Sequence, residues 1–171
     1  MLYLFKIEYP QETKFTMQVA IKDTQTLWDL HQAIQQKLNY DPGQMASFLI
    51  VDEKEFIQQE EYPSINMENL SEDSPMKTVS IDNIAKRKGQ KLIYLFDMFS
   101  ERFFVLDLIA TSEEEDTKLS YPYLFNEQGV PPDQTFFDMG IENDSQKNID
   151  DDDEFGFDDD DMYGIDEDDV F

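Results

Sequence analysis

The chain has 171 residues with a formal net charge of −26, and 40% of its residues are hydrophobic. It contains no cysteine, which excludes disulfides and thiolate metal sites. No apolar run reaches the ~18 residues of a membrane-spanning helix, and the opening MLYLFKIEYP does not resemble a signal peptide, so we expect a cytoplasmic protein without a membrane partner. The negative charge argues against direct binding of nucleic acid, because the phosphates would be repelled.

The first third of the chain carries the clearest periodic patterns. Residues 3–9 and 14–22 alternate apolar and polar side chains, which indicates two half-buried strands, and residues 10–13 suit the loop of an antiparallel hairpin. A helix is expected over residues 27–38, where apolar side chains recur at helical spacing. Residues 48–51 form an apolar run typical of a buried strand. This strand–strand–helix–strand order resembles the opening of a β-grasp fold.

The remaining elements are shorter and separated by loops. Residues 52–77 are polar with two prolines, so a long loop is expected, and residues 80–88 are predicted to form a short helix. Strands are predicted over 92–96 and 102–109 and form a second hairpin, while residues 118–139 are expected to be irregular. Together the patterns predict an α+β fold, with a mixed or antiparallel sheet of about five strands and one main helix.

The end of the chain differs in composition from the rest. Residues 141–171 contain fifteen acidic residues and one lysine, and they carry −14 of the net charge. Such a run of like charges repels itself and stays extended. The sequence therefore predicts a folded domain over 1–140 and a disordered acidic tail over 141–171.

Three blocks of sequence resemble the plasmid ORF-3-like family, which is also described as insertion-sequence passenger proteins. The blocks are TLWDLHQAIQQKLNYD (26–41), KLIYLFDMFSERFFVLDL (91–108) and YPYLFNEQGVPPD (121–133). The family usually has a Gly-Asp-x-Trp-x-His turn between two strands, and this chain has Phe-Ser-Glu-Arg-Phe at 99–103 instead. It also lacks the cysteine that the family tends to carry near Tyr123. The resemblance implies an α+β body and carries over no catalytic residue.

The sequence does not predict an enzyme. His31 is the only histidine; it is either a general base or ligand, or a partly buried histidine with a hydrogen-bonded ring, and the second interpretation is favoured. No G-x-S-x-G elbow and no phosphate-cradling glycine loop is present. One histidine without cysteine makes a poor metal site. We therefore expect no catalytic residues, no metal and no cofactor, although an enzyme with an unidentified site is kept as an alternative.

A cluster of basic residues has three possible roles. Lys86, Arg87, Lys88 and Lys91 lie close together around Gly89. They are candidates for contact with nucleic acid or with another partner. Alternatively, they are cations placed favourably at the C-terminus of a helix, or they receive the acidic tail of the same molecule.

The acidic tail suggests a function in protein binding. Phe155, Phe157, Tyr163 and Phe171 alternate with its acidic blocks, a composition typical of segments that dock on basic partners. The simpler interpretation is a solubility tail. The leading hypothesis is a non-enzymatic interaction protein whose tail binds a basic protein. The alternative, suggested by the passenger label alone, is a nucleic-acid-associated accessory protein of a mobile element.

Overall fold

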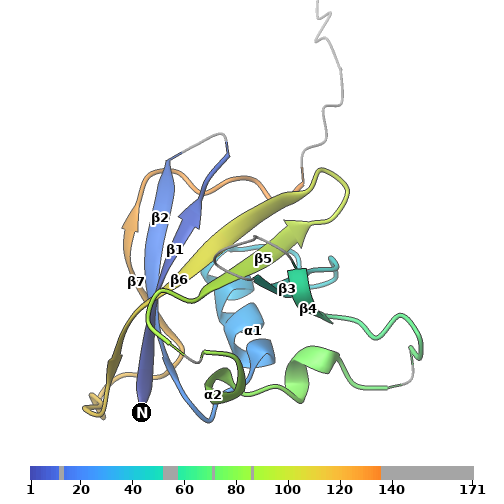
Figure 1. Ribbon diagram of the computed structural model, residues 1–171. Helices are drawn as coiled ribbons and strands as arrows, with labels where there is room; N and C mark the ends of the chain where they lie inside the picture. The colour runs from blue at the N-terminus through green and yellow to red at the C-terminus, as the bar shows by residue number, and fades with distance from the viewer. Residues whose placement is uncertain (12–13, 52–57, 71, 86, 136–171) are drawn as a thin grey trace, which may run out of the picture. The chain divides into compact units, whose positions relative to one another are not determined.

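A single antiparallel sheet forms the framework of the part of the chain that the structure describes (Figure 1). The computed structural model describes residues 1–11, 14–51, 58–70, 72–85 and 87–135. Within these ranges the sheet has seven strands in the order β4-β3-β5-β6-β1-β2-β7. The strands are β1 (Leu2–Tyr9), β2 (Phe15–Lys22), β3 (Ser47–Val51), β4 (Gln58–Pro63), β5 (Lys91–Asp97), β6 (Arg102–Ser112) and β7 (Tyr123–Gln128).

The first hairpin agrees with the prediction. β1 and β2 pair antiparallel in a register that sets Tyr9 opposite Phe15 at the loop end. Phe5, Ile7 and Tyr9 on β1 are buried, and the residues between them are partly exposed. Period-two alternation of apolar side chains thus gives the sheet one buried face.

The main helix, α1 (Leu27–Leu38), covers that buried face (Figure 1). It begins at Thr26, whose hydroxyl accepts the backbone N–H of Asp29 while the Asp29 carboxylate accepts the backbone N–H of Thr26. This reciprocal pairing satisfies donors that a helix N-terminus otherwise leaves open. The helix ends at Asn39 in the left-handed conformation with φ 56°. Short elements η1 (Pro75–Lys77) and α2 (Ile81–Ile84) follow β4.

Aromatic side chains fill the space between α1 and the sheet. The rings of Phe96 and Phe104 lie 4.7 Å apart between centroids, and those of Phe48 and Tyr94 also lie 4.7 Å apart. All four are fully buried. Each such side chain contributes about 1.5–3 kcal/mol through burial, so the aromatic residues are a substantial part of what stabilises this layer.

The predicted fold class was wrong. The described part of the chain is mostly sheet, with seven antiparallel strands and not about five, and it is not the α+β arrangement expected. β4 lies in the segment expected to be a loop, and β7 lies in the segment expected to be irregular. The β-grasp resemblance also fails, because β3 pairs with β4 and β5 and not with β1.

Two further predictions concern the helix after β4 and the end of the chain. The helix predicted over residues 80–88 is a single turn, Ile81–Ile84. The predicted tail lies outside the described residues, so the domain boundary at 140 and the disorder of residues 141–171 stay predictions.

Gly129 provides a test of the β7 edge. It has φ +86°, and a Cβ there would lie 2.0 Å from the backbone oxygen of Lys14. We expect Gly129→Ala to lower the free energy of unfolding by more than about 2 kcal/mol, because the left-handed conformation alone costs ~1–2 kcal/mol. At Gly43 the Cβ would meet only the movable Asp41 side chain at 3.2 Å, so Gly43→Ala is the matched control. Urea unfolding of both variants checks this; equal losses would contradict it.

Candidate functional site

The turn between β5 and β6 presents apolar side chains to solvent. The Asp97 carboxylate oxygen Oδ1 accepts the backbone N–H groups of Phe99 at 3.1 Å and Ser100 at 3.2 Å, which fixes the turn. Glu101 has φ 52°, in the left-handed region. As a result Phe99 is fully exposed and Met98 is 37% exposed. Large apolar side chains at the tip of a hairpin are unusual, since turns favour polar residues and glycine.

A buried ion pair holds the base of this turn. Asp97 Oδ2 accepts from Arg102 Nε at 3.0 Å and from Arg102 Nη2 at 2.9 Å, and both side chains are 6% exposed. The guanidinium carbon lies 5.4 Å from the centre of the Phe96 ring. Burial works to raise the pKa of Asp97, but the hydrogen bonds from Arg102 and Ser100 outweigh it and hold that pKa below its usual value.

A hollow of about 600 Å³ lies beside the turn. We call it the turn hollow. Its lining comes from three separate parts of the chain, namely Asp41, Gly43, Gln44, Met45, Asp97, Met98, Phe99 and Thr135. Gln134 joins two of these parts, because its amide accepts the backbone N–H of Asp41 at 2.5 Å and donates to the Asp41 carbonyl at 3.0 Å. Arg102 Nη2 donates to the Gln134 carbonyl at 2.9 Å. This bond connects the third part of the lining, the β5–β6 turn, to the other two.

His31 lies in a second polar cluster, beneath α1. It is 2% exposed, and its Nδ1 lies 2.8 Å from the hydroxyl of Tyr94 on β5. The Gln35 amide donates to the same hydroxyl at 3.0 Å. Burial lowers the pKa of His31 to about 4 and raises that of Tyr94, so both are neutral near pH 7. The favoured interpretation expected a partly buried histidine with a hydrogen-bonded ring; the hydrogen bond is present, and the ring is buried more completely than expected.

The predicted basic cluster does not sit at a helix end. α2 ends at Ile84, before the cluster begins, so the helix C-terminus interpretation was wrong. Lys91 lies on β5 and pairs with Asp107 at 3.2 Å. Arg87 and Lys88 line a hollow of about 300 Å³ beside Met1 and Tyr3.

The other sequence candidates are outside the described ranges. These are Lys86, Phe155, Phe157, Tyr163 and Phe171. Their contact with a partner stays a prediction.

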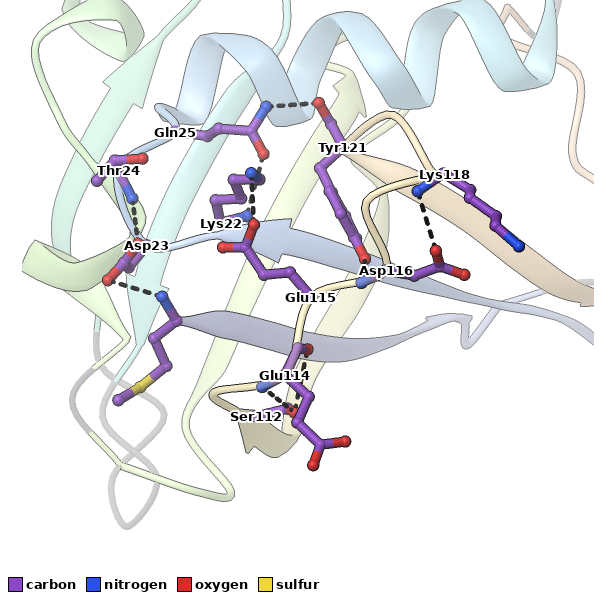
Figure 2. A network of polar contacts seen from close by, with 11 residues as sticks. Lys22, Asp23, Thr24, Gln25, Ser112, Glu114, Glu115, Asp116, Lys118 and Tyr121 are labelled. Carbon is purple, nitrogen blue, oxygen red and sulfur yellow. Dashed lines mark hydrogen bonds and ion pairs between the residues drawn. The ribbon is translucent and has the colours of Figure 1, made fainter.

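A third polar group connects the N-terminus to the segment after β6 (Figure 2). Lys22 Nζ pairs with Glu115 at 2.6 Å, the Gln25 amide donates to the Tyr121 carbonyl at 2.7 Å, and the Met1 amino group pairs with Asp23 at 3.3 Å. Exposed ion pairs of this kind contribute little to stability. We assign this network to positioning the loop and not to chemistry.

Two features are absent from the part of the chain that the structure describes. No group of three or more His, Asp or Glu side chains suited to a metal ion occurs there. Within the same part of the chain, no helix has the length and apolar character to cross a membrane. The compartment of the protein stays a prediction.

Comparison with known proteins identifies the family. The family model described as "Plasmid pRiA4b ORF-3-like protein" matches residues 6–153. The chain belongs to this family. The resemblance seen in the sequence is therefore confirmed. No curated protein matches this ORF-3-like protein.

A solved structure shares the fold. It is the crystal structure of a protein of unknown function, MM3350, from Methanosarcina mazei Go1. The two chains are 18% identical, and the TM-score is 0.52. The match covers 74% of this ORF-3-like protein and 68% of the other chain. At this identity the likeness concerns the fold alone.

Phe99 is the candidate functional residue that the sequence patterns did not single out. In the sequence, the β5–β6 turn differs from the family pattern because it lacks a glycine, a tryptophan and a histidine. The available signal was the pair Met98 and Phe99 in a short hairpin connection, where a polar turn is the norm.

The buried ion pair makes a stability prediction. Asp97→Asn removes the carboxylate that pairs with the buried Arg102 guanidinium at 2.9 Å, so we expect a loss of about 3–5 kcal/mol of unfolding free energy at pH 7. Asp107→Asn, which breaks the more exposed pair with Lys91, is the control and costs less than about 1 kcal/mol.

The pH dependence of that loss has a definite sign. The pKa of Asp97 is lowered on folding from 3.8, so its contribution is present above that pH and disappears as the pH falls further. Urea unfolding of Asp97→Asn and wild type gives curves that converge at low pH. A loss independent of pH would contradict this origin.

His31 predicts a second pH dependence. The unfolded chain binds a proton near pH 6.5 and the folded chain only near pH 4, so the unfolding free energy falls as the pH is lowered between these values. The slope reaches about 1.4 kcal/mol per pH unit. His31→Gln removes this contribution, and because no other histidine exists, the difference between wild type and variant isolates it. Parallel pH profiles in urea unfolding would show that the ring is not buried neutral.

Proposed function

We propose that this ORF-3-like protein is a non-enzymatic interaction protein that binds a basic protein partner. In this proposal the partner is attracted by the acidic residues 141–171 and anchored on the body at the turn hollow. The observation that carries the proposal is the full exposure of Phe99 beside this hollow.

Phe99 has the properties of a binding anchor. It stands with Met98 at the edge of a hollow that Met45 also lines. Aromatic side chains beside pockets are enriched among the residues that dominate binding energy. Covering Phe99 would contribute about 1.5–3 kcal/mol, and the buried Asp97–Arg102 pair below it holds the turn in place before binding, which reduces the entropic cost.

The charge of the chain supports a basic partner. Six Lys and Arg side chains of the described residues already pair with carboxylates of the same molecule. The pairs are Lys6–Glu8, Lys22–Glu115, Lys37–Glu127, Lys77–Asp73, Lys91–Asp107 and Arg102–Asp97. The net charge of −26 therefore attracts cationic surfaces and disfavours anionic ones.

The two parts of the chain have separable roles in this proposal. Long-range attraction by the tail raises the association rate, and this effect falls with added salt. Contact with Phe99 acts at short range and sets the dissociation rate. The aromatic residues Phe155, Phe157, Tyr163 and Phe171 add apolar contacts along the tail.

The other hypotheses lack a specific observation in their favour. A nucleic-acid accessory role needs available cations, and six of those described are paired internally. An enzymatic role for His31 is disfavoured because the ring is buried and its Nδ1 is engaged by Tyr94.

Affinity capture with full-length variants tests the proposal. The variants are Phe99→Ser, a tail in which every Asp and Glu of 141–171 becomes Asn or Gln, and the control Met67→Ser, which removes an apolar side chain that is 63% exposed elsewhere. We expect a basic protein to be recovered by wild type after nuclease treatment. Its dissociation should accelerate about tenfold or more with Phe99→Ser.

The tail variant and the control separate the two roles. The neutral tail should slow association and weaken its salt dependence, whereas Met67→Ser should change neither rate. Recovery unaffected by both Phe99→Ser and the neutral tail, or recovery that depends on nucleic acid, would overturn the proposal.

A further inference from the structure

The turn hollow contains one carboxylate that is paired and one that is not. Two acidic residues line it, Asp97 and Asp41. Both oxygens of Asp97 are engaged, because Oδ1 accepts two backbone N–H groups of the turn and Oδ2 accepts from Arg102. Asp41 is exposed, and no lysine or arginine in the described part of the chain forms an ion pair with it. The hollow therefore offers a negative charge to an incoming group.

The Asp41 carboxylate is held in place beside another lining residue. Its Oδ1 accepts the backbone N–H of Gly43 at 2.8 Å, and Gly43 also lines the turn hollow. The backbone of Asp41 is bound as well, because its N–H and its carbonyl both bond the side-chain amide of Gln134. A charge that is already fixed in position loses little freedom when a ligand pairs with it.

The same hollow has a large apolar lining. Met45, Met98 and Phe99 contribute to it, and Phe99 is fully exposed. A wholly apolar occupant would cover these side chains but would remove water from the Asp41 carboxylate without pairing it, which is costly. An occupant with an apolar stem and a cationic end suits both parts of the lining. Lysine and arginine side chains have this form.

The chain itself contains a comparable site for a guanidinium group. The Arg102 guanidinium lies 5.4 Å from the centre of the Phe96 ring and binds the Asp97 carboxylate through two nitrogens. A guanidinium is planar, stacks on aromatic rings and pairs with carboxylates, whereas an ammonium group is compact and more strongly hydrated. The turn hollow also combines a carboxylate with a phenylalanine ring, so arginine is favoured over lysine.

We propose that the turn hollow binds an arginine side chain of the basic partner. The guanidinium stacks on the Phe99 ring and pairs with the Asp41 carboxylate, and the methylene stem packs against Met45 and Met98. This inference rests on the proposed function, because it names the partner side chain that Phe99 anchors. The net charge of −26 adds a general attraction for such a cation.

N-acetyl-arginine amide is the probe, because it presents the side chain without the rest of a partner. The matched control ligand is N-acetyl-citrulline amide, in which an uncharged urea group replaces the guanidinium. The backbone amide NMR signals of Gly43, Phe99 and Ser100 in the full-length protein report on the turn hollow. We expect saturable shifts with a Kd of about 10 mM at low salt, and binding of the citrulline compound at least about threefold weaker.

Two variants that remove the same charge locate the contact. Asp41→Asn keeps an oxygen for the Gly43 N–H and should weaken binding of the arginine compound about threefold or more. Asp116→Asn is the matched control, because Asp116 Oδ1 likewise accepts a backbone N–H two residues on, that of Lys118 at 2.9 Å. Asp116 does not line the turn hollow, so this variant should bind nearly as wild type does. If Asp41→Asn does not fold, the two ligands on wild type decide.

Three results would refute the inference. The arginine compound could leave the three signals unchanged up to about 100 mM, tenfold above the expected Kd, the citrulline compound could bind equally well, or the two variants could lose affinity equally. Capture of a basic protein that depends on Phe99, without binding of the arginine compound, overturns this inference alone. Binding of the arginine compound at the hollow, without capture of any basic protein, overturns only the proposed function.

Discussion

The hydroxyl of Tyr94 constrains how α1 sits on the sheet. Tyr94 is fully buried on β5, a strand with neighbours on both sides, and its hydroxyl meets His31 and Gln35 of α1. A buried hydroxyl without partners is costly. The helix therefore turns these two residues toward the sheet, and Trp28 and Gln32 line with them a hollow of about 480 Å³ beside α1, the α1 hollow. The two hydrogen bonds therefore fix the rotation of the helix about its axis, together with its apolar packing.

The β5–β6 turn has polar residues in buried positions and an apolar residue in an exposed one. Asp97 and Arg102 are buried where apolar residues are usual, and Phe99 is exposed where a polar residue is usual. The ion pair fixes the two strand ends, and the Asp97 carboxylate also binds the backbone of the turn. The residues between these fixed points, 98–101, are exposed. Departures from the ordinary pattern that the surroundings enforce are typical of functional sites.

The elements predicted correctly are those with strong local periodicity. β1, β2 and α1 were predicted because one face of each is buried, and burial imposes a period of two or 3.6 on the sequence. β4 and β7 were missed because they are edge strands, paired on one side only. Polar side chains such as Glu60 and Glu61 are tolerated at an edge and even protect it. The contacts that build the candidate sites join residues as far apart as His31 and Tyr94, or Asp41 and Gln134, and no local pattern encodes such pairs.

The two hollows share one wall. Tyr40 and Pro42 line the α1 hollow, whereas Asp41 and Gly43 line the turn hollow. These residues form a turn, closed by the hydrogen bond from the Gln44 backbone N–H to the Asp41 carbonyl at 3.2 Å, so one short stretch of chain borders both hollows. Residues 132–134 bind two neighbouring residues of this wall. The Tyr40 hydroxyl donates to the Pro132 carbonyl, and the Asp41 backbone N–H donates to the Gln134 side chain. A ligand in one hollow changes affinity in the other only if it distinguishes two arrangements of this wall. Residues 132–134 hold the wall from both sides, so the energy of any second arrangement includes the loss of these bonds.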